Sequence, residues 1–285
     1  MKIAISGANG YIGRNLVQML KHAGHDLIIL NRQELYTTDR LKEKLSGTDA
    51  VIHLAGAPIL CRWTPKNKEE IVRSRTVSTQ NIVEALLALA ENNRPHIFIS
   101  ASAIGIYAAD QEHTESSTSF SKDFVGEVVH QWENSSSGLL ASVRKVIFRI
   151  GLVLGKESKT MKQMLPLFRL GLGGRLGSGK QPFPFVHIQD VGKAFLLAVG
   201  NNEIHGIYNL VAPQNCSNEQ LTNELAKALH RPAFFAVPEF ALKLVYGEAA
   251  SLLLQSPVVY PERLLNSGFK FSFPDIQSCL GEITN

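Results

Sequence analysis

A glycine-rich segment near the amino terminus is the clearest chemical feature of the sequence. It runs GANGYIG from Gly7 to Gly13, directly between a strand-like and a helix-like stretch. Gly7 permits a sharp turn, Gly10 lets backbone amides approach an anion, and Gly13 allows close packing of helix on strand. The free N–H groups and partial positive charge at a helix start attract phosphate. The segment therefore predicts a pyrophosphate site, with an ordinary glycine turn as the alternative.

The end of the second predicted strand bears on which dinucleotide binds. Sites for NAD usually have an acidic residue there, which holds the ribose hydroxyls. This chain has Asn31, which lacks the carboxylate that would repel a 2′-phosphate, followed by Arg32, which could pair with that phosphate through two hydrogen bonds. Glu34 lies close enough to complicate the interpretation, and a merely solvated Arg32 is the alternative. We predict NADP(H), with NAD(H) as the less favoured coenzyme.

A parallel sheet must position these residues, and the first two-thirds of the chain has the matching pattern. Short apolar strand-like runs alternate there with helix-like stretches. The expected strands are Lys2–Ser6, Asp26–Leu30, Ala50–Ala55, His96–Ala101, Val143–Leu154 and Gly206–Val211. Apolar residues at helical spacing begin at Ile12 and stop before Gly24, and Pro65–Ala90 has the pattern of a long helix. Lys66, Lys68, Glu69 and Glu70 have the spacing of its solvated face.

The alternation ends after Gly155, where the pattern becomes helical with a glycine-rich stretch at Gly171–Gly179. We predict an α/β fold, a Rossmann doubly wound parallel sheet with a smaller, mostly helical C-terminal part on the substrate side. The Rossmann core takes residues 1–155, with 186–212 returning to it. Residues 156–185 and 213–285 form the cap. The 285 residues suffice for both parts.

Composition excludes several function classes. The net charge of +4 is not gathered into a basic stripe, which argues against a nucleic-acid partner. No stretch approaches the roughly 20 apolar residues that a membrane helix needs, and the first residues are strand-like rather than a signal segment. Cys61, Cys216 and Cys279 lie far apart without a CxxC pair. They predict a reducing, cytoplasmic location and no metal site.

Two further segments resemble the extended short-chain dehydrogenases/reductases. Asp49–Gly56 (DAVIHLAG) resembles the DxxxHLAx stretch of their fourth strand, and Phe98–Ser102 with Gly105–Tyr107 resembles their fifth strand, which ends at the catalytic serine. The resemblance is to the atypical, NAD-dependent epimerase/dehydratase-like branch called epimerase family proteins. It also rests on Arg62-Trp63, Ser74-Arg75, Trp132-Glu133, Leu172-Gly173-Gly174, His187-Ile188-Gln189-Asp190, Pro261–Leu264 and Gly268-Phe269.

The resemblance implies a coenzyme held along the carboxyl ends of the strands. The glycine loop and the resemblance together predict the coenzyme-binding residues Gly7, Asn9, Gly10, Tyr11, Ile12, Gly13, Asn31, Arg32, Leu54, Ala55, Gly56, Arg75 and Ser100. A small-molecule substrate with a hydroxyl or carbonyl group would bind between core and cap, near His187 and Arg175. Better-known relatives act on nucleotide sugars. In the superfamily, the helices that correspond to Pro65–Ala90 and Val125–Trp132 commonly form homodimer interfaces.

The chain differs from these relatives at the residues that transfer the proton. Active members use a Tyr-x-x-x-Lys pair that exchanges a proton with the substrate. Here the residues four after the six tyrosines are Asn15, Arg40, Gln111, Ala212, Ala250 and Leu264. Phe124 and Val128 hold the expected positions, and neither can carry a proton. Ser102 and Tyr107 remain as the candidate catalytic residues, each with a structural role as the alternative.

Two other features keep two interpretations each. The stretch from Gly171 to Lys180 could be a substrate-side lid whose Arg175 grips a phosphate or carboxylate, or only a surface connector. His187 could face the substrate, or belong to a helix start that Asp190 caps. Two functions therefore stand at this point. One is an NADP(H)-dependent oxidoreductase or epimerase-like enzyme with a modified proton path. The other is a non-catalytic NADP(H)-binding redox sensor or scaffold.

Overall fold

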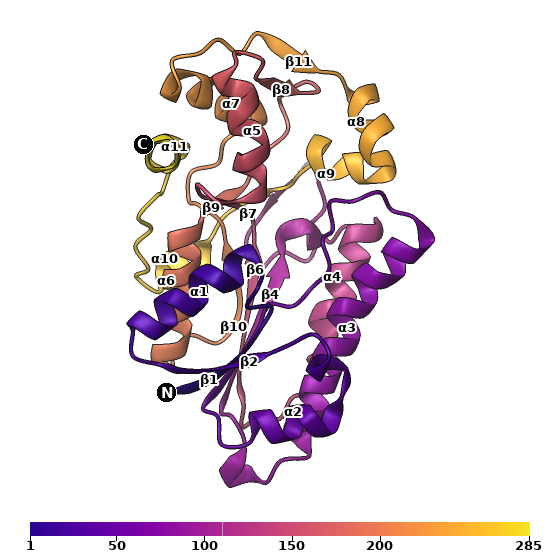
Figure 1. Ribbon diagram of the computed structural model, residues 1–285, viewed down its shortest axis with the longest axis vertical. Coiled ribbons are helices and arrows are strands. Elements are labelled where there is room, and N and C mark those ends of the chain that lie inside the picture. Colours follow the sequence, from indigo (N-terminus) through magenta and orange to yellow (C-terminus); the bar gives the residue numbers. More distant parts are fainter. Residues whose placement is uncertain (110) are drawn as a thin grey trace.

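The main sheet has six parallel strands in the order β2-β1-β3-β4-β6-β10 (Figure 1). The computed structural model describes residues 1–109 and 111–285. The strands are β1 (Lys2–Ser6), β2 (Asp26–Leu30), β3 (Ala50–His53), β4 (Ile97–Ala103), β6 (Arg144–Ile150) and β10 (Gly206–Leu210). The strand order reverses between β1 and β3, which is where Rossmann sheets bind their ligands.

Helices cover both faces of this sheet, so the predicted doubly wound fold is confirmed. Helices α1 (Tyr11–His22) and α6 (Ile188–Gly200) contact each other on one face. Helices α2 (Thr38–Leu45), α3 (Pro65–Leu87) and α4 (Phe124–Asn134) lie on the other face (Figure 1). The sheet is buried between two apolar clusters, one packed under α1 and α6 and the other under α2 and α3. The carboxyl edge of the sheet is thereby held rigidly.

Side-chain caps explain where α3 and α4 begin. Thr64 caps α3, since its hydroxyl accepts a hydrogen bond from the Asn67 amide at 3.3 Å, and Pro65 occupies the first turn. Asp123 caps α4 in the same way, accepting from the Gly126 amide at 2.8 Å. These caps place the two helix starts close to the carboxyl edge of the sheet.

The predicted single strand over Val143–Leu154 is wrong, because the chain leaves the main sheet at Gly151. The Gly151 amide still donates to Leu210 O at 3.0 Å, but the Leu152 amide donates to Pro184 O at 2.9 Å. The segment beyond is β7 (Leu152–Leu154), which pairs in parallel with β9 (Phe185–His187) as a separate two-stranded sheet. One strand-like stretch therefore serves two sheets.

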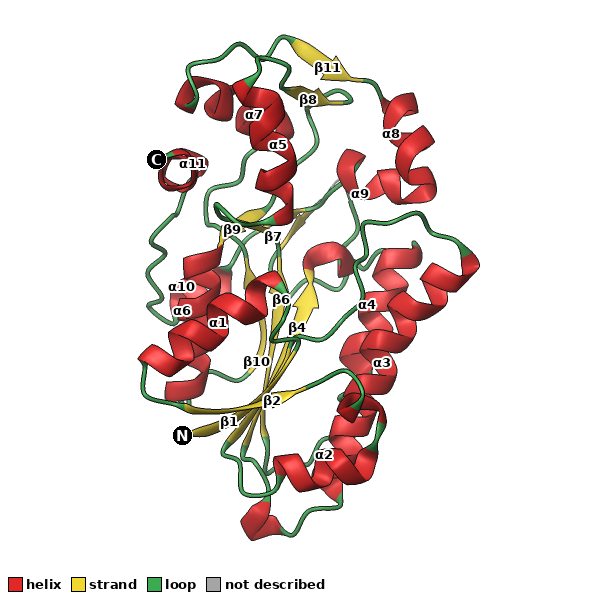
Figure 2. Cartoon of the chain, in the orientation of Figure 1, coloured by secondary structure: helices red, strands yellow, loops and turns green. Residues whose placement is uncertain are grey.

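A mostly helical cap lies beyond the carboxyl edge of the sheet, as Figure 2 shows. Its elements are α5 (Lys159–Arg169), β8 (Gly174–Leu176), α7 (Asn218–Ala228), β11 (Phe235–Val237), α8 (Glu239–Tyr246), α9 (Ser251–Leu254) and α11 (Ile276–Thr284). An apolar cluster of its own joins α5, α7 and α11. No helix in the described residues is long and apolar enough to cross a membrane.

Part of the C-terminal segment returns to the core. Strand β12 (Val258–Val259) pairs with β5 (Glu112–His113), and α10 (Glu262–Asn266) contacts β10. The division into residues 1–155 with 186–212 and 156–185 with 213–285 stays a prediction. These contacts show that the last third of the chain braces the sheet as well as the cap.

Candidate functional site

The glycine loop has the close contacts that the sequence pattern predicted. Gly7 has a φ of +71°, and a Cβ atom there would lie 2.7 Å from the Leu54 carbonyl carbon. A Cβ atom on Gly13 would lie 2.2 Å from Gly7 O. Both positions therefore require glycine, because the turn presses against β3 on one side and against α1 on the other.

The start of α1 is arranged to bind an anion. Gly10 is the cap residue, no side chain caps the helix, and its first turn has no acidic residue. The first amides of a helix lack partners within the helix, so here they remain available to a ligand. Arg14 donates to Asn9 O at 2.9 Å and adds positive charge beside the loop. The loop thus fits a pyrophosphate.

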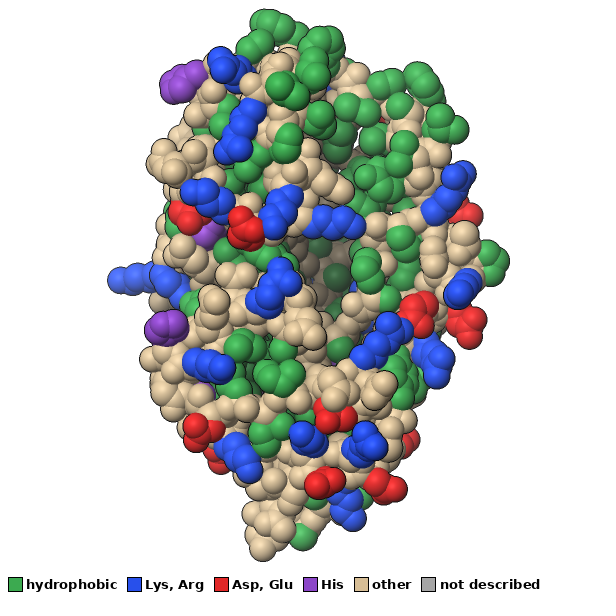
Figure 3. Space-filling view, in the orientation of Figure 1, with side chains coloured by type: hydrophobic (Ala, Val, Ile, Leu, Met, Phe, Trp, Pro, Cys, Tyr) green, Lys and Arg blue, Asp and Glu red, His purple; other side chains and the backbone are tan. Residues whose placement is uncertain are grey.

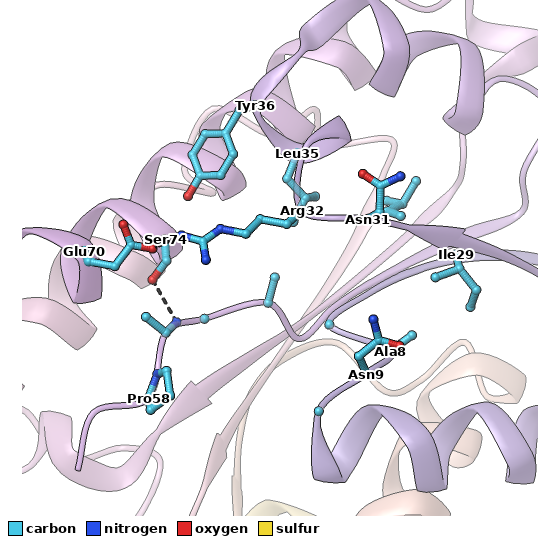
Figure 4. Close-up of a pocket in the computed structure, with 16 residues that line it drawn as sticks. Ala8, Asn9, Ile29, Asn31, Arg32, Leu35, Tyr36, Pro58, Glu70 and Ser74 are labelled. Carbon is cyan, nitrogen blue, oxygen red and sulfur yellow. Dashed lines mark hydrogen bonds and ion pairs between the residues drawn. The ribbon is translucent and has the colours of Figure 1, made fainter. Parts of the chain in front are cut away.

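A cavity of about 430 Å³ begins at this loop and runs past the end of β2 to α3 (Figure 4). Its volume suits part of a dinucleotide. Seven of the residues predicted from sequence line it: Gly7, Asn9, Gly10, Asn31, Arg32, Ala55 and Gly56. The structure therefore brings the glycine loop and the β2 end to one cavity, as an adenosine and its pyrophosphate would require.

Other predicted coenzyme residues do not line that cavity. Ile12 packs against the apolar core, and Leu54 contacts Gly7 through its backbone. The Ser100 hydroxyl donates to Ala101 O at 2.9 Å within the buried β4. The Tyr11 hydroxyl lies against Gly155, and burial raises the pKa of Tyr11 to about 12. Their contact with a coenzyme stays a prediction.

Arg75 and Ser74, both on α3, form hydrogen bonds with the loop that follows β3. The Arg75 guanidinium donates to Ala57 O and Ile71 O, both at 3.0 Å, and lies 5.2 Å from the ring centre of Trp132. The Ser74 hydroxyl accepts from the Ala57 amide at 2.9 Å (Figure 4). Burial lowers the pKa of Arg75 to about 10. Arg75 was predicted to touch the coenzyme, and here it supports the loop that lines the cavity.

His53, which sequence reasoning did not select, joins β1, β3 and α3 beneath the glycine loop. Its Nδ1 lies 2.7 Å from Ser6 Oγ, and its Nε2 lies 3.1 Å from Ser78 Oγ. Ser78 donates its hydroxyl proton to Ser74 O at 2.7 Å, so Nε2–H donates to Ser78 and Ser6 donates to Nδ1. Burial, with Arg75 as a second cause, lowers the pKa of His53 to about 4. The ring is therefore neutral near pH 7.

Two carboxylates near Arg32 do different things. Glu34 is buried, accepts from the Asn31 amide at 2.7 Å and lies 3.6 Å from Lys44 Nζ. It shapes the turn after β2 and does not line the cavity. Glu70 does line the cavity, where it forms an ion pair with Arg32 (Figure 4). Sequence reasoning missed Glu70, because it is 38 residues from Arg32 and has the spacing of a solvated helix face.

The candidate catalytic Ser102 lies in a buried ionic network at the ends of β4 and β6. Its hydroxyl donates to Glu133 Oε1 at 2.5 Å. Arg149 donates to the same carboxylate through Nε at 2.8 Å and Nη2 at 2.7 Å. Burial disfavours the Arg149 charge, but the ion pair with Glu133 prevails and raises its pKa. The hydroxyl proton of Ser102 is thus already engaged in a hydrogen bond to Glu133.

Tyr107, the other candidate, belongs to the same network. It is 2% exposed, donates to Asn209 Oδ1 at 2.8 Å and accepts from Arg149 Nη1 at 2.9 Å. Its ring stacks on His113 with centres 4.7 Å apart. Burial raises the pKa of Tyr107, although the Arg149 charge opposes this. The geometry favours the structural alternative for Tyr107, and its role in catalysis stays a prediction.

The positions expected for a proton-carrying pair are apolar in space as in sequence. Phe124 is half-buried against Trp63, with ring centres 4.9 Å apart, and Lys68 Nζ lies 5.2 Å from the Phe124 ring centre. Val128 is buried on the inner face of α4. The other buried residues of that helix are Val125, Gly126, Val129 and Trp132. Neither Phe124 nor Val128, nor these other buried residues, has a side chain that could protonate a substrate oxygen.

His187 and Arg175, the predicted substrate residues, are both paired. His187 caps α6, accepting from the Gln189 amide at 3.4 Å, and its Nε2 lies 3.1 Å from Glu282 Oε2. Burial lowers the pKa of His187, and Glu282 opposes this. The predicted cap, Asp190, instead accepts from the Ser272 and Phe273 amides at 2.7 and 3.0 Å. It anchors the C-terminal segment.

Arg175 lies on β8, so part of the predicted glycine-rich loop is a strand, paired with β11. Its guanidinium bonds Glu219 at 3.0 Å within the cap. Figure 3 shows a hollow between cap and core with lysine and arginine side chains on its rim. The structure does not bring Arg175 or His187 to the coenzyme cavity, and their contact with substrate stays a prediction.

Comparison with known proteins gives matches along nearly the whole chain. Residues 3–210 match the model of the NAD dependent epimerase/dehydratase family, and residues 237–283 match a domain of unknown function, DUF1731. Epimerase family protein SDR39U1 of Mus musculus is 34% identical over 291 residues, covering 99% of both chains. Epimerase family protein YfhF of Bacillus subtilis is 31% identical, covering 99% of this chain and 98% of its own.

A solved structure also matches the whole chain. The crystal structure of human epimerase family protein SDR39U1 (isoform 2) with NADPH has a TM-score of 0.93 to this chain at 32% identity. The match covers 100% of this chain and 99% of the human one. The sheet and the cap therefore occur together in a protein of similar length.

Proposed function

The chain belongs to the NAD-dependent epimerase/dehydratase family, and on that premise we propose an NADP(H)-binding protein of the oxidoreductase or epimerase type. Its substrate is a small hydroxyl or carbonyl compound bound in the hollow between core and cap. The observation that carries the coenzyme assignment is the cavity that joins the glycine loop to Asn31 and Arg32. The similar human structure with NADPH supports it.

Each part of the cavity has a distinct task toward the coenzyme. The amides at the start of α1 bind the pyrophosphate, and Arg32 binds the 2′-phosphate. The loop Ala55–Pro58, held by Ser74 and Arg75, forms the opposite wall. When bound, the nicotinamide supplies or accepts a hydride. Since Phe124 and Val128 cannot carry a proton, any proton must come from another group or from water.

The coenzyme assignment is tested by titrating the protein calorimetrically with NADPH and, separately, with NADH. Arg32→Ala should weaken NADPH binding by roughly 10- to 100-fold, because it removes a charge-assisted hydrogen bond to the 2′-phosphate. NADH binding should change little. Equal losses for both coenzymes would show that Arg32 does not recognise the 2′-phosphate. Arg40→Ala, on α2 and outside the cavity, is the matched control.

A second function, an NADP(H)-binding sensor or scaffold without turnover, is favoured by one observation. Ser102 and Tyr107 are both engaged in the buried Arg149–Glu133 network. Single-turnover mixing with a broad substrate panel distinguishes the two functions through NADPH absorbance. The variant Phe124→Tyr/Val128→Lys is a companion test, because gained reductase activity would show that the rest of the site is competent.

A homodimer and a cytoplasmic location remain predictions from the sequence.

A further inference from the structure

Glu70 supplies a carboxylate to the end of the cavity where β2 offers none. It comes from α3, and its side chain lines the same cavity as Asn31 and Arg32. Figure 4 shows Arg32 reaching across the cavity toward Glu70. The two side chains form an ion pair and are 74% and 35% exposed, so the pair lies at the solvent-facing rim. A ligand group that binds Arg32 there must therefore meet Glu70.

We propose that Glu70 moderates the preference of this chain for NADPH, by competing with the 2′-phosphate of NADPH for Arg32. The proposal rests on the coenzyme site described under the proposed function. It assigns to Glu70 a moderating role: the ion pair lowers the advantage of NADPH over NADH that Arg32 alone would give.

The competition follows from the donors that Arg32 can offer. Arg32 Nη2 is already bonded to Glu70 Oε1. A phosphate group binds a guanidinium best through two parallel hydrogen bonds, and each pair of donors that can make them includes Nη2. The phosphate also brings about two negative charges at pH 7, which the Glu70 carboxylate repels. An exposed ion pair is weak, so the competition should change affinity by about fivefold rather than abolish binding.

The same carboxylate suits a coenzyme without the 2′-phosphate. Sites for NAD hold the ribose hydroxyls with a carboxylate. Asn31 cannot serve in that way, and Glu34 is turned toward the Asn31 amide and Lys44. Of the described residues that line the cavity, Glu70 is the acidic one. Arg73, whose guanidinium lies 5.1 Å from the Tyr36 ring centre, adjoins Arg32 and Glu70 and keeps the rim positive.

The test is calorimetric titration of the full chain with NADPH and with NADH at one low ionic strength. Glu70→Gln keeps the size of the side chain and removes its charge. We expect it to tighten NADPH binding by about fivefold and to leave NADH binding unchanged or weaker. Glu69→Gln is the matched control, because Glu69 is exposed on the same helix and does not line the cavity. It should change neither dissociation constant.

A second pair of variants isolates the competition. In an Arg32→Ala background, Glu70→Gln should no longer tighten NADPH binding fivefold, since no guanidinium remains to be released. An equal gain in both backgrounds overturns the proposal, because Glu70 would then act by repulsion alone. Unchanged selectivity overturns it too, as does weaker NADPH binding. These titrations read binding, so a lack of turnover in every variant bears only on the proposed enzymatic function.

Discussion

The two halves of the sheet's carboxyl edge differ in what their polar side chains are free to do. At the ends of β1, β2 and β3, the glycine loop, Asn31 and Arg32 face a cavity. At the ends of β4 and β6, Ser102 and Arg149 are buried and bonded to Glu133. Dinucleotide binding needs backbone amides and a few exposed donors, whereas proton transfer needs particular side chains. One sheet can therefore bind a coenzyme fully and still lack the usual proton path.

The largest expected effect comes from removing the carboxylate of the buried network. Glu133→Ala leaves the Arg149 charge buried without its partner, which should cost about 3–5 kcal/mol of unfolding free energy. Equilibrium urea unfolding measures this, with Glu127→Ala on the exposed side of α4 as control. Coenzyme affinity should stay within about twofold, since Glu133 does not line the cavity. A loss of NADPH binding in the folded variant would show that the two halves are coupled.

The comparison also shows what the sequence could predict. Local patterns predicted the strand bounds Lys2–Ser6 and Asp26–Leu30, and the glycine turn at Gly7, because each depends on residues that are neighbours in the chain. The same patterns located the cavity through Asn31 and Arg32. They did not separate β6 from β7, because both have strand-like sequences and their pairing partners lie far away in the chain.

The remaining site residues depend on contacts between distant segments. Glu70 reaches Arg32 only because α3 packs against residues 34–36, the turn that follows β2. His53, on β3, bonds Ser6 and Ser78, which lie on two other elements. Asp190 was predicted as a cap because it was expected to precede a helix, whereas α6 already begins at Ile188. Its carboxylate instead binds amides 82 and 83 residues away. A single sequence contains these residues without indicating their partners.

The pH dependence of stability tests the half of the edge that binds the coenzyme, where His53 lies beneath the glycine loop. The pKa of His53 is about 4 in the folded protein, below the usual 6.5. The unfolded chain therefore binds a proton more readily between these values, and the contribution of His53 to stability is lost as pH falls through that window. The loss should reach about 3 kcal/mol. In His53→Gln the fall in unfolding free energy between about pH 6.5 and 4 should be smaller by this amount. An unchanged slope would mean that another group governs acid stability, and His130→Gln, on the surface of α4, is the control.

The smallest expected effect decides whether Tyr107 has a structural role or takes part in the reaction. Tyr107→Phe removes the hydroxyl that accepts from Arg149 and lies within donating distance of Asn209 Oδ1 and Thr114 O, so three groups lose a partner. This should lower the free energy of unfolding by about 1–2 kcal/mol and leave both coenzyme affinities unchanged. Tyr246→Phe is the control, since the Tyr246 hydroxyl has no hydrogen-bond partner among the described residues. If stability is unchanged and NADPH oxidation in single-turnover mixing is abolished, Tyr107 takes part in the reaction. In that case the β4 half of the edge must rearrange when substrate binds, because the hydroxyl is now enclosed by Asn209 and Arg149.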